Sequence, residues 1–343
     1  DDRPTVHIGY ASSIARLPSW CAQVCVTDDL PVAPQWWWTV TRADARDALP
    51  SRVGWDPDHA RGSSGVLSVR IGMSQSGPIE LDLVSDGPHA LVAGCTGSGK
   101  SEALIGWLAS IAHCYSPDKV RFVLIDYKGG GLAAAFSREG LTLPHLAGTV
   151  TNLDGSEVAR SLASLRAELT RRQRMLDEAK RETGEATMDI TSYLRHYRTG
   201  DVAEPMPHLF IVADEFAELK QQEPDFMEGL ISAARIGRSL GVHLVLATQK
   251  PAGVVSDQIS RFRVCLRVAD AADSKEMVRR ADAARLEGPG RLLLLVGYDE
   301  RYVLGQAAYA GGPYAPGASP RTKASVELLT PTGGVLDRLR LEG

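Results

Sequence analysis

Several patterns that mark common protein sites are missing from this sequence. It contains five cysteines, and the closest pair, Cys21 and Cys25, has no second pair and no flanking histidine, so a zinc site is not predicted. No H-E-x-x-H pattern, the common signature of zinc proteases, occurs either. Because the thiols are scattered along the chain, we expect them to be reduced, as is usual in the cytosol.

Long apolar runs and a strong charge of either sign are also missing. No apolar stretch approaches the length of about 18 residues that a membrane-spanning helix needs. The net charge is −4, from 38 basic and 42 acidic side chains, so no global basic excess indicates a nucleic-acid partner. The chain shows no signal peptide and begins Asp1-Asp2-Arg3. Because it does not begin with Met, we expect it to be part of a longer protein.

The clearest pattern that is present is a phosphate-binding loop. Residues 94–101, Gly-Cys-Thr-Gly-Ser-Gly-Lys-Ser, match G-x-x-x-x-G-K-[ST] at every fixed position. A short apolar run at 90–93 precedes the loop, and a stretch with apolar residues at helical spacing follows it at 102–113. Strand, glycine loop and helix in this order are the context in which the motif binds nucleotide phosphates.

Each part of this loop has a predicted role. The glycines let backbone N–H groups turn toward one point, where the helix N-terminus adds partial positive charge. Lys100 is expected to reach the β- and γ-phosphates of ATP, and the Ser101 hydroxyl to bind Mg²⁺. The predicted nucleotide-binding residues are Gly94, Cys95, Thr96, Gly97, Ser98, Gly99, Lys100, Ser101 and Glu102.

The fold class follows from the alternation of apolar strands with helical stretches. Residues 66–72 and 79–84 alternate in polarity around a turn at 74–77, which predicts a β-hairpin before the loop. Buried strands are then expected at 90–93, 120–125, 208–213, 242–247, 264–268 and 291–296. Long apolar strands of this kind predict an α/β fold, with a mostly parallel sheet covered by helices on both faces. With 343 residues, the chain suits one large α/β domain with additions, or two domains.

A second signature of nucleotide hydrolysis ends the strand at 208–213. Asp214 is expected to hold the Mg²⁺ shell, because the metal needs a neutralising oxygen ligand. Glu215 is expected to orient and deprotonate the attacking water, which has little nucleophilicity of its own. Gln249 ends the next strand, and its amide can touch both the γ-phosphate and the water; the alternative is an ordinary polar residue at a strand end.

Arginines occur in two places where their role is open from spacing alone. Arg235 and Arg238 lie near the end of the helix expected near 224–239, and a guanidinium there can stabilise the γ-phosphate of a neighbouring subunit. The alternative is a pair of surface residues. Arg171, Arg172 and Arg174 decorate a long helix expected after Asp154, and we predict a solvated face for them.

The flanks of the chain carry less information. Residues 61–65 have the composition of a linker, as do residues 311–320. Three adjacent tryptophans at 36–38 point to either a partner surface or packing against the main domain, and we favour packing.

Four stretches together resemble the FtsK/SpoIIIE family of P-loop motor ATPases. The resemblance covers residues 65–310, and the stretches are 87–101, 212–216, 241–251 and 266–274. Two further stretches, 126–130 and 143–154, are similar to the branch of this family that drives type VII (ESX, WXG100) secretion, the EccC/EssC ATPases. The resemblance implies a RecA-like core, ATP with Mg²⁺, and a ring, expected to be a hexamer, whose subunit interfaces hold the nucleotide.

The resemblance also assigns roles to individual residues and segments. The trans-acting arginine of the family falls on Arg238, with Arg235 as the alternative, and its polar sensor falls on Gln249. Residues 1–64 are then an N-terminal linker or part of a preceding region, 65–310 the ATPase domain, and 311–343 a linker and tail. Members of this branch carry membrane helices and several ATPase modules. We therefore expect one module from the cytoplasmic part of a cytoplasmic-membrane protein.

The function predicted from the sequence is an ATPase motor for the secretion of WXG100-type proteins. Its expected partners are copies of itself, the secreted substrates and the membrane components of the machine. Two alternatives stay open: a translocase of double-stranded DNA, and a nucleotide-gated docking module with negligible turnover in isolation. The acidic net charge and the type VII-like stretches favour secretion, so DNA is the less favoured partner.

Overall fold

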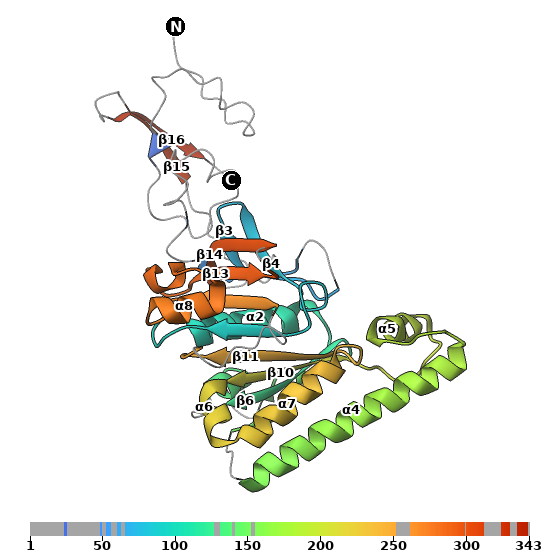
Figure 1. Cartoon of the computed structure of the whole chain (residues 1–343). Helices are drawn as coiled ribbons and strands as arrows, with labels where there is room; N and C mark the ends of the chain where they lie inside the picture. The colour runs from blue at the N-terminus through green and yellow to red at the C-terminus, as the bar shows by residue number, and fades with distance from the viewer. Residues whose placement is uncertain are drawn as a thin grey trace.

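The order of strands in one large sheet brings the predicted motifs together. The computed structural model describes residues 24–25, 49, 53–55, 60–62, 66–126, 131–138, 141–151, 155–251, 261–298, 300–311, 324–329 and 335–341. Within these residues, an eleven-stranded sheet has the order β4-β3-β14-β13-β12-β5-β11-β10-β6-β9, with β2 paired to β14. Figure 1 shows its strands stacked through the body of the molecule.

The parallel half of this sheet carries the site. The strands from β12 to β9 pair in parallel, and those from β12 to β4 are antiparallel. The fold class predicted from the sequence is therefore confirmed. The strands are β2 Val53–Gly54, β3 Val69–Ser74, β4 Gly77–Leu81, β5 Ala90–Ala93, β6 Val120–Asp126, β9 Leu146–Val150, β10 His208–Asp214, β11 Val242–Thr248, β12 Phe262–Leu266, β13 Arg291–Val296 and β14 Arg301–Tyr309.

Continuous apolar runs suit the central strands because both faces of the sheet are covered. In β10, Leu209 and Ile211 point into one core, whereas Phe210 and Val212 point into the other. All seven residues of β10 and all seven of β11 are buried. A strand with one solvated face would alternate in polarity instead, so the uninterrupted pattern marks the middle of the sheet.

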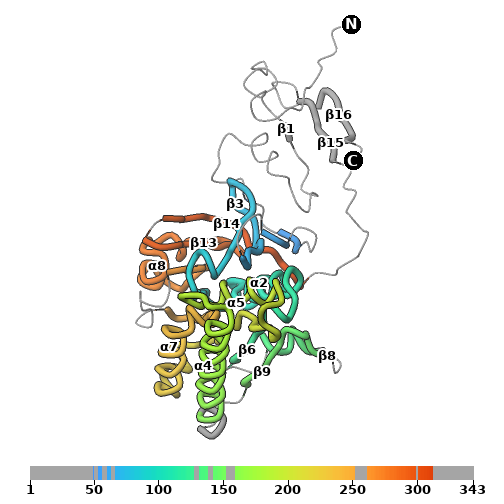
Figure 2. The backbone as a smooth tube through the Cα atoms, turned by 90° about the vertical axis from the view of Figure 1, so that its right-hand side faces the viewer, coloured from blue at the N-terminus to red at the C-terminus, as the bar shows by residue number. Residues whose placement is uncertain are grey.

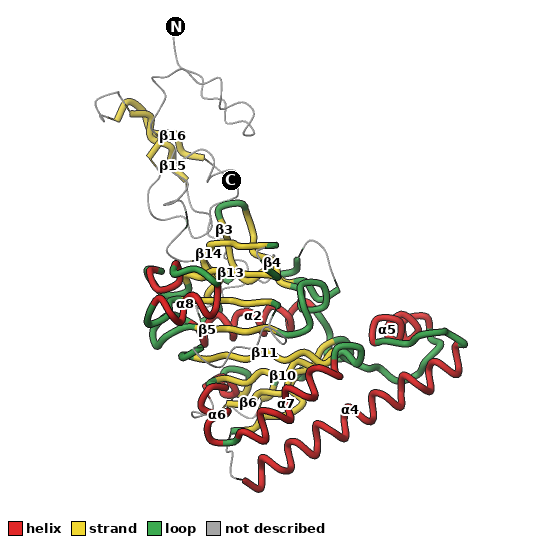
Figure 3. Tube along the Cα trace, viewed as in Figure 1, coloured by secondary structure: helices red, strands yellow, loops and turns green. Residues whose placement is uncertain are grey.

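Helices occupy both faces of the sheet, as predicted. One core contains α2 (Lys100–Cys114) with the β3–β4 hairpin, and the other contains residues of α4 (Gly155–Thr183), α7 (Pro224–Gly237) and α8 (Ala271–Val278). Figures 2 and 3 show α4 running beside α7. The remaining helices are α3 Gly131–Ala134, α5 Ile190–Thr199, α6 Phe216–Gln222 and the 3-10 turn η5 Asp282–Arg285.

Strand β14 was not predicted from the sequence. It pairs with β13 and β3 and so joins the hairpin to the main sheet. Gly305 interrupts the apolar pattern of β14, so the pattern of apolar residues alone does not predict a strand there. The glycine is needed there because a Cβ atom would lie 2.1 Å from Ile79 Cδ1 and 2.8 Å from Met73 O.

The prediction of a solvated arginine face on α4 is wrong for Arg172. Its side chain is among the largest fully buried ones, and it donates hydrogen bonds to Leu240 O and Glu168 Oε1, both at 2.8 Å. Burial lowers the pKa of its guanidinium. Arg171 pairs with Glu168 at the half-exposed edge, and Arg174 is exposed as predicted. Arg172 points inward because its part of α4 packs against the core, where Leu240 offers a buried carbonyl that needs a donor.

Several predictions fall outside the described residues, and within those residues a small antiparallel sheet is separate from the main one. It joins β1 (Val24–Cys25), β15 (Ala324–Leu329) and β16 (Val335–Leu341). A short hairpin joins β7 (Ser137–Arg138) to β8 (Leu141–Thr142). The tryptophans at 36–38 and residues 312–320 of the predicted linker lie outside the described residues. Among the residues that are, no helix combines the length and the apolar composition needed to cross a membrane.

Candidate active site

The P-loop lies between the carboxyl end of β5 and the first turn of α2. Gly97 (φ 76°) and Gly99 (φ 89°) adopt the left-handed conformation that glycine tolerates without strain. A Cβ atom on Gly99 would also approach Gly290 N to 2.8 Å, so this glycine is required on two counts. The Ser98 N–H donates to Cys95 O at 3.0 Å, which closes the loop.

Two neighbouring strands anchor the loop from either side. The Gly94 N–H donates to Thr248 O at the end of β11, and the Cys95 N–H donates to Arg267 O just after β12. Ser101 and Glu102 are exposed on the first turn of α2. The first amides of a helix have no intrahelical partner. The loop therefore presents backbone donors and a helix N-terminus at the carboxyl edge of the sheet, which is the expected geometry of an anion cradle.

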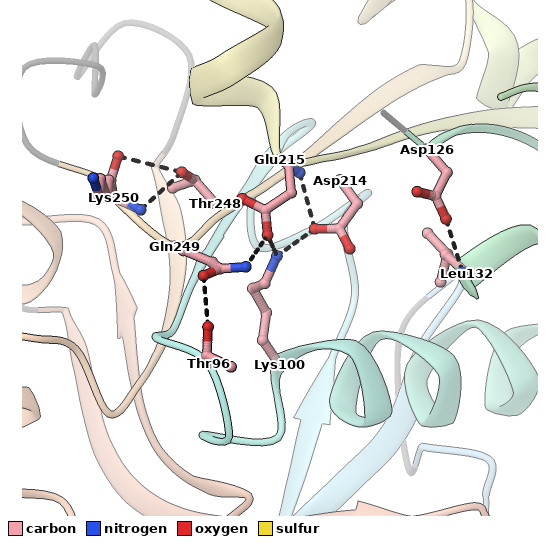
Figure 4. Close-up of polar contacts among 9 residues, drawn as sticks. All are labelled: Thr96, Lys100, Asp126, Leu132, Asp214, Glu215, Thr248, Gln249 and Lys250. Carbon is pink, nitrogen blue, oxygen red and sulfur yellow. Dashed lines mark hydrogen bonds and ion pairs between the residues drawn. The ribbon is translucent and has the colours of Figure 1, made fainter. Parts of the chain in front are cut away.

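The catalytic residues predicted from β10 meet Lys100 of the loop (Figure 4). Lys100 Nζ donates to Asp214 Oδ1 and, at 2.9 Å, to Glu215 Oε1. The Lys100 side chain is 5% exposed, and those of Asp214 and Glu215 are 12% and 8% exposed. Burying a charged group costs free energy unless an opposite charge is close to it. Here the Lys100 ammonium contacts both carboxylates.

Glu215 has a backbone conformation that is uncommon for its residue type. Its φ of 57° lies in the left-handed region, and its N–H donates to Asp214 Oδ1 at 2.9 Å. It is also the N-cap residue of α6, so the chain turns sharply from β10 into the helix at this point. Strained residues of this kind persist where the surroundings hold them, and they are concentrated at functional sites. The turn brings the Glu215 carboxylate toward Lys100 and Gln249.

Gln249 connects the acidic pair to the P-loop. Its Nε2 donates to Glu215 Oε1 at 2.7 Å, and its Oε1 accepts from the Thr96 hydroxyl at 2.8 Å. The predicted sensor therefore touches the predicted base directly. The contact with Thr96 was not predicted, because no local pattern in the sequence pairs a loop hydroxyl with a residue 153 positions away.

The carboxylates of the site carry more negative charge than Lys100 balances. Burial raises the pKa of the Asp214 carboxyl, and the Lys100 ammonium partly offsets this rise. Asp126 ends the next strand in register with Asp214, and its Oδ2 accepts from the Leu132 N–H at 2.8 Å. Asp126 begins the stretch at 126–130 that resembles the type VII branch, and the sequence gave its side chain no role.

The donors at this edge fit Mg²⁺ bound together with phosphates. The described residues contain no cluster of three or more His, Cys, Asp or Glu placed to hold a metal ion by themselves. Magnesium in nucleotide sites typically uses one or two protein oxygens, waters and phosphate oxygens. Asp214 and Ser101 offer a carboxylate and a hydroxyl of this kind, so the residues present fit the ion.

Arg235 and Arg238 lie away from this site. Arg235 is in the last turn of α7 and Arg238 is its C-cap residue, and both are exposed. Arg238 lies close enough to His89, just before β5, for its charge to lower the histidine pKa. Strand β11 starts beside Arg238 and ends beside the loop. Its seven residues span about 23 Å at roughly 3.3 Å per residue, so neither arginine belongs to the P-loop of its own chain.

The chain is similar in sequence to a known protein family and to curated proteins. The model of the FtsK/SpoIIIE family matches residues 52–253. The ESX secretion system protein EccC of Geobacillus thermodenitrificans is 50% identical over 256 residues, which are 72% of this chain and 17% of that relative. The chain thus spans less than a fifth of the length of this curated relative.

Two solved structures are similar as well. The cytoplasmic domain of the Thermomonospora curvata type VII secretion ATPase EccC shares 37% identity, with a TM-score of 0.64 over 76% of this chain and 31% of that one. The pCW3 conjugation coupling protein TcpA, in a monomer form with ATPγS, shares 27% identity, with a TM-score of 0.60 over 78% of this chain and 72% of its own. Both are P-loop ATPase domains, in agreement with the fold described above.

Proposed function

This chain belongs to the FtsK/SpoIIIE family, and from that premise and the site geometry we propose that it is an ATP-binding and ATP-hydrolysing motor module for type VII secretion. One observation carries the proposal. Lys100 of the P-loop, Asp214 and Glu215 after β10, and Gln249 after β11 form a single hydrogen-bonded network at the carboxyl edge of the sheet. An isolated phosphate-binding loop would need only the first of these residues.

Each member of the network has a role in the proposed hydrolysis. Lys100 and the loop amides bind the phosphates and neutralise charge, which is the main contribution a protein makes to phosphoryl transfer. Glu215 orients and deprotonates the attacking water. Gln249 contacts Glu215 and faces the loop, so it is suited to sense whether a γ-phosphate is present. Bound Mg²⁺ would supply positive charge to the phosphates, held by Asp214 and Ser101.

Lys100 must change partners when a nucleotide binds. In this structure its ammonium is taken up by Asp214 and Glu215. Phosphate oxygens compete for the same donor, and Mg²⁺ competes for Asp214. When Lys100 turns to the phosphates, Asp214 loses its positive partner, and a bound Mg²⁺ would supply the charge that replaces it.

The site is proposed to be completed by a neighbouring copy of the chain. Arg238 is exposed near the amino-terminal end of β11, whereas the P-loop lies at the carboxyl ends of the strands. In a head-to-tail arrangement, this arginine can contact the nucleotide bound by the neighbouring chain. We propose that copies form a ring, a hexamer by family resemblance, and that Arg238 acts in trans, with Arg235 as the alternative. Mixing Arg238→Ala chains with Lys100→Ala chains tests this, because activity restored in mixed rings requires each defect to lie on a different subunit. If the Arg238→Ala chain alone is fully active, the trans role passes to Arg235 or is dismissed.

Secretion is the process that the comparisons favour. The curated relative above is a component of an ESX secretion system, and the similar Thermomonospora structure is a type VII secretion ATPase. We therefore propose WXG100-type proteins as substrates and the membrane part of the secretion machine as partner. We further propose that the module, with residues 65–310 as its ATPase domain, works on the cytoplasmic side of the cytoplasmic membrane.

A DNA translocase is the second candidate, and the similarity to a conjugation coupling protein favours it specifically. The test is steady-state ATP turnover of the full chain at moderate salt, with duplex DNA or a substrate's C-terminal signal peptide added separately and Lys100→Ala as the background control. We expect a response to the peptide and none to DNA. Stimulation by DNA that falls steeply with salt would contradict the secretion proposal. Binding of ATP without turnover under any condition would favour a docking module.

A further inference from the structure

The hydrogen bonds from the P-loop to the acidic pair have directions fixed by chemistry (Figure 4). Glu215 Oε1 lies 2.7 Å from Gln249 Nε2 and 2.9 Å from Lys100 Nζ. An ionised carboxylate can only accept, so the Gln249 amide must present its nitrogen to Glu215. The amide oxygen then faces Thr96, whose hydroxyl lies 2.8 Å away and must donate to it.

We propose that Thr96 is a positioning residue: its hydroxyl holds the Gln249 amide in the orientation that directs an N–H group at Glu215. The proposal rests on the ATP-hydrolysing function proposed above and assigns the Thr96 side chain a task separate from phosphate binding. Phosphate binding by the loop uses the backbone N–H of this residue. The hydroxyl acts through Gln249 on Glu215, the residue proposed to activate water.

The amide needs this help because packing does not fix its orientation. The terminal torsion of glutamine is broad and nearly two-fold, so the oxygen and nitrogen ends exchange easily unless a partner distinguishes them. Gln249 is only partly buried, and Thr96 is exposed at the mouth of the loop. A flipped amide would put its oxygen against the Glu215 carboxylate. The donor on Thr96 and the acceptor on Glu215 both oppose that flip.

The position of Thr96 in the loop supports the same assignment. The P-loop pattern leaves this position open, so phosphate binding does not require a hydroxyl there. At the end of β11, the loop is also tied to the Thr248 carbonyl by the Gly94 N–H at 3.1 Å. The Gly94–Thr248 backbone bond fixes the loop against β11. The Thr96 hydroxyl adds a second connection, to the side chain of Gln249, the residue after Thr248. Loop and sensor are thereby kept in one arrangement.

The kinetic test compares Thr96→Val, which removes the donor and keeps the shape, with Thr96→Ser, which keeps the donor. For Thr96→Val in the full chain we expect kcat to fall about fivefold or more, the loss that one net hydrogen bond accounts for, with ATP affinity unchanged within about twofold. Thr96→Ser should recover most of the loss. Thr170→Val is the matched control, because that hydroxyl is exposed on α4 and donates only to Arg166 O of its own helix.

A double variant separates positioning from general damage. In a Gln249→Ala background, Thr96→Val should cost nothing further, because the hydroxyl acts only through the amide. Losses that multiply would overturn the proposal, as would a Thr96→Val chain with wild-type kcat.

A second readout does not depend on turnover. In chains with ¹⁵N-labelled glutamine, the Gln249 side-chain amide signal, assigned by its loss in Gln249→Ala, should exchange slowly with solvent. Thr96→Val should accelerate that exchange, and Thr96→Ser should not. An unchanged signal in Thr96→Val would overturn the positioning role even if the chain is an active ATPase. A changed signal in a chain without ATPase activity would leave Thr96 as proposed and remove the proposed function instead.

Discussion

Three buried histidines predict that this protein loses stability in mild acid. His208 begins β10, His243 lies in β11, and His89 precedes β5. His208 Nδ1 and His243 Nε2 are 2.9 Å apart, His243 Nδ1 lies 2.9 Å from Pro88 O, and His89 Nδ1 accepts from the Leu244 N–H. These contacts suit neutral rings: a proton on His243 Nε2 would face the N–H of His208.

The size and sign of the effect follow from the pKa values. Burial is the main cause that lowers the pKa of His89 and of His208 to about 4, and that of His243 to about 3; the charges of Arg238 and Arg172 add to it. The unfolded chain, with histidine near 6.5, therefore binds more protons below neutrality. Stability is complete above about pH 6.5 and falls as the pH drops toward 4, by about 2 kcal/mol at pH 5 for each of His89 and His208.

Urea unfolding of the full chain at pH 7.5 and pH 5 measures this loss. Together His89 and His208 should remove about 4 kcal/mol, a large share of the typical 5–15 kcal/mol of a domain, and His243 adds a further loss of the same sign. Asp214, whose raised pKa works in the opposite direction, is accounted for by repeating the pair of measurements on Asp214→Asn. His196→Gln checks the sign, because hydrogen bonds to Asp201 and Glu185 raise the pKa of His196 and its protonation stabilises the fold in acid, so this variant should show a larger loss than the wild-type chain. A free energy of unfolding that is equal at both pH values refutes the reasoning.

Three substitutions test other parts of the account. Lys100→Ala should abolish ATP binding in calorimetry, and unchanged affinity would mean that the phosphate cradle is misassigned. Gly99→Ala should lower both ATP affinity and the melting temperature, because its φ of 89° and the 2.8 Å approach of Gly290 N leave no room for a methyl group; wild-type behaviour in both assays would contradict the loop geometry. Arg172→Ala should cost about 3 kcal/mol of unfolding free energy in urea, because it empties a fully buried site and leaves the Leu240 carbonyl without this donor. Arg174→Ala, its exposed neighbour on α4, should change that free energy by less than about 0.5 kcal/mol, and equal losses in the two variants would contradict the burial of Arg172.

The motifs that the sequence predicted are those in which neighbouring residues determine the outcome. The P-loop is a local turn whose glycines and helix start are encoded within eight positions. The central strands are equally visible, since a strand buried on both faces needs an uninterrupted apolar run, as in β10 and β11. Asp214 and Glu215 were placed correctly at a strand end for the same reason.

The features that the sequence did not predict depend on partners far along the chain. Arg172 is spaced like a surface arginine, and only the buried carbonyl of Leu240, 68 positions away, explains its inward course. Strand β14 contains Gly305, which reads as a break until the close approach of the hairpin is known. The bond between Thr96 and Gln249 arises because parallel strands bring their carboxyl ends together, and no local pattern specifies which side chains then meet.

The central claim is that Glu215 and the P-loop together hydrolyse ATP. The most direct measurement compares ATP affinity and single-turnover hydrolysis in the wild-type chain and in Glu215→Gln, with Mg²⁺ present and the chain assembled with its neighbours. Loss of a general base typically costs about 10²–10⁴-fold in rate. We therefore predict wild-type affinity with hydrolysis at least about a hundredfold slower. Equal rates of hydrolysis in the two chains would contradict the account.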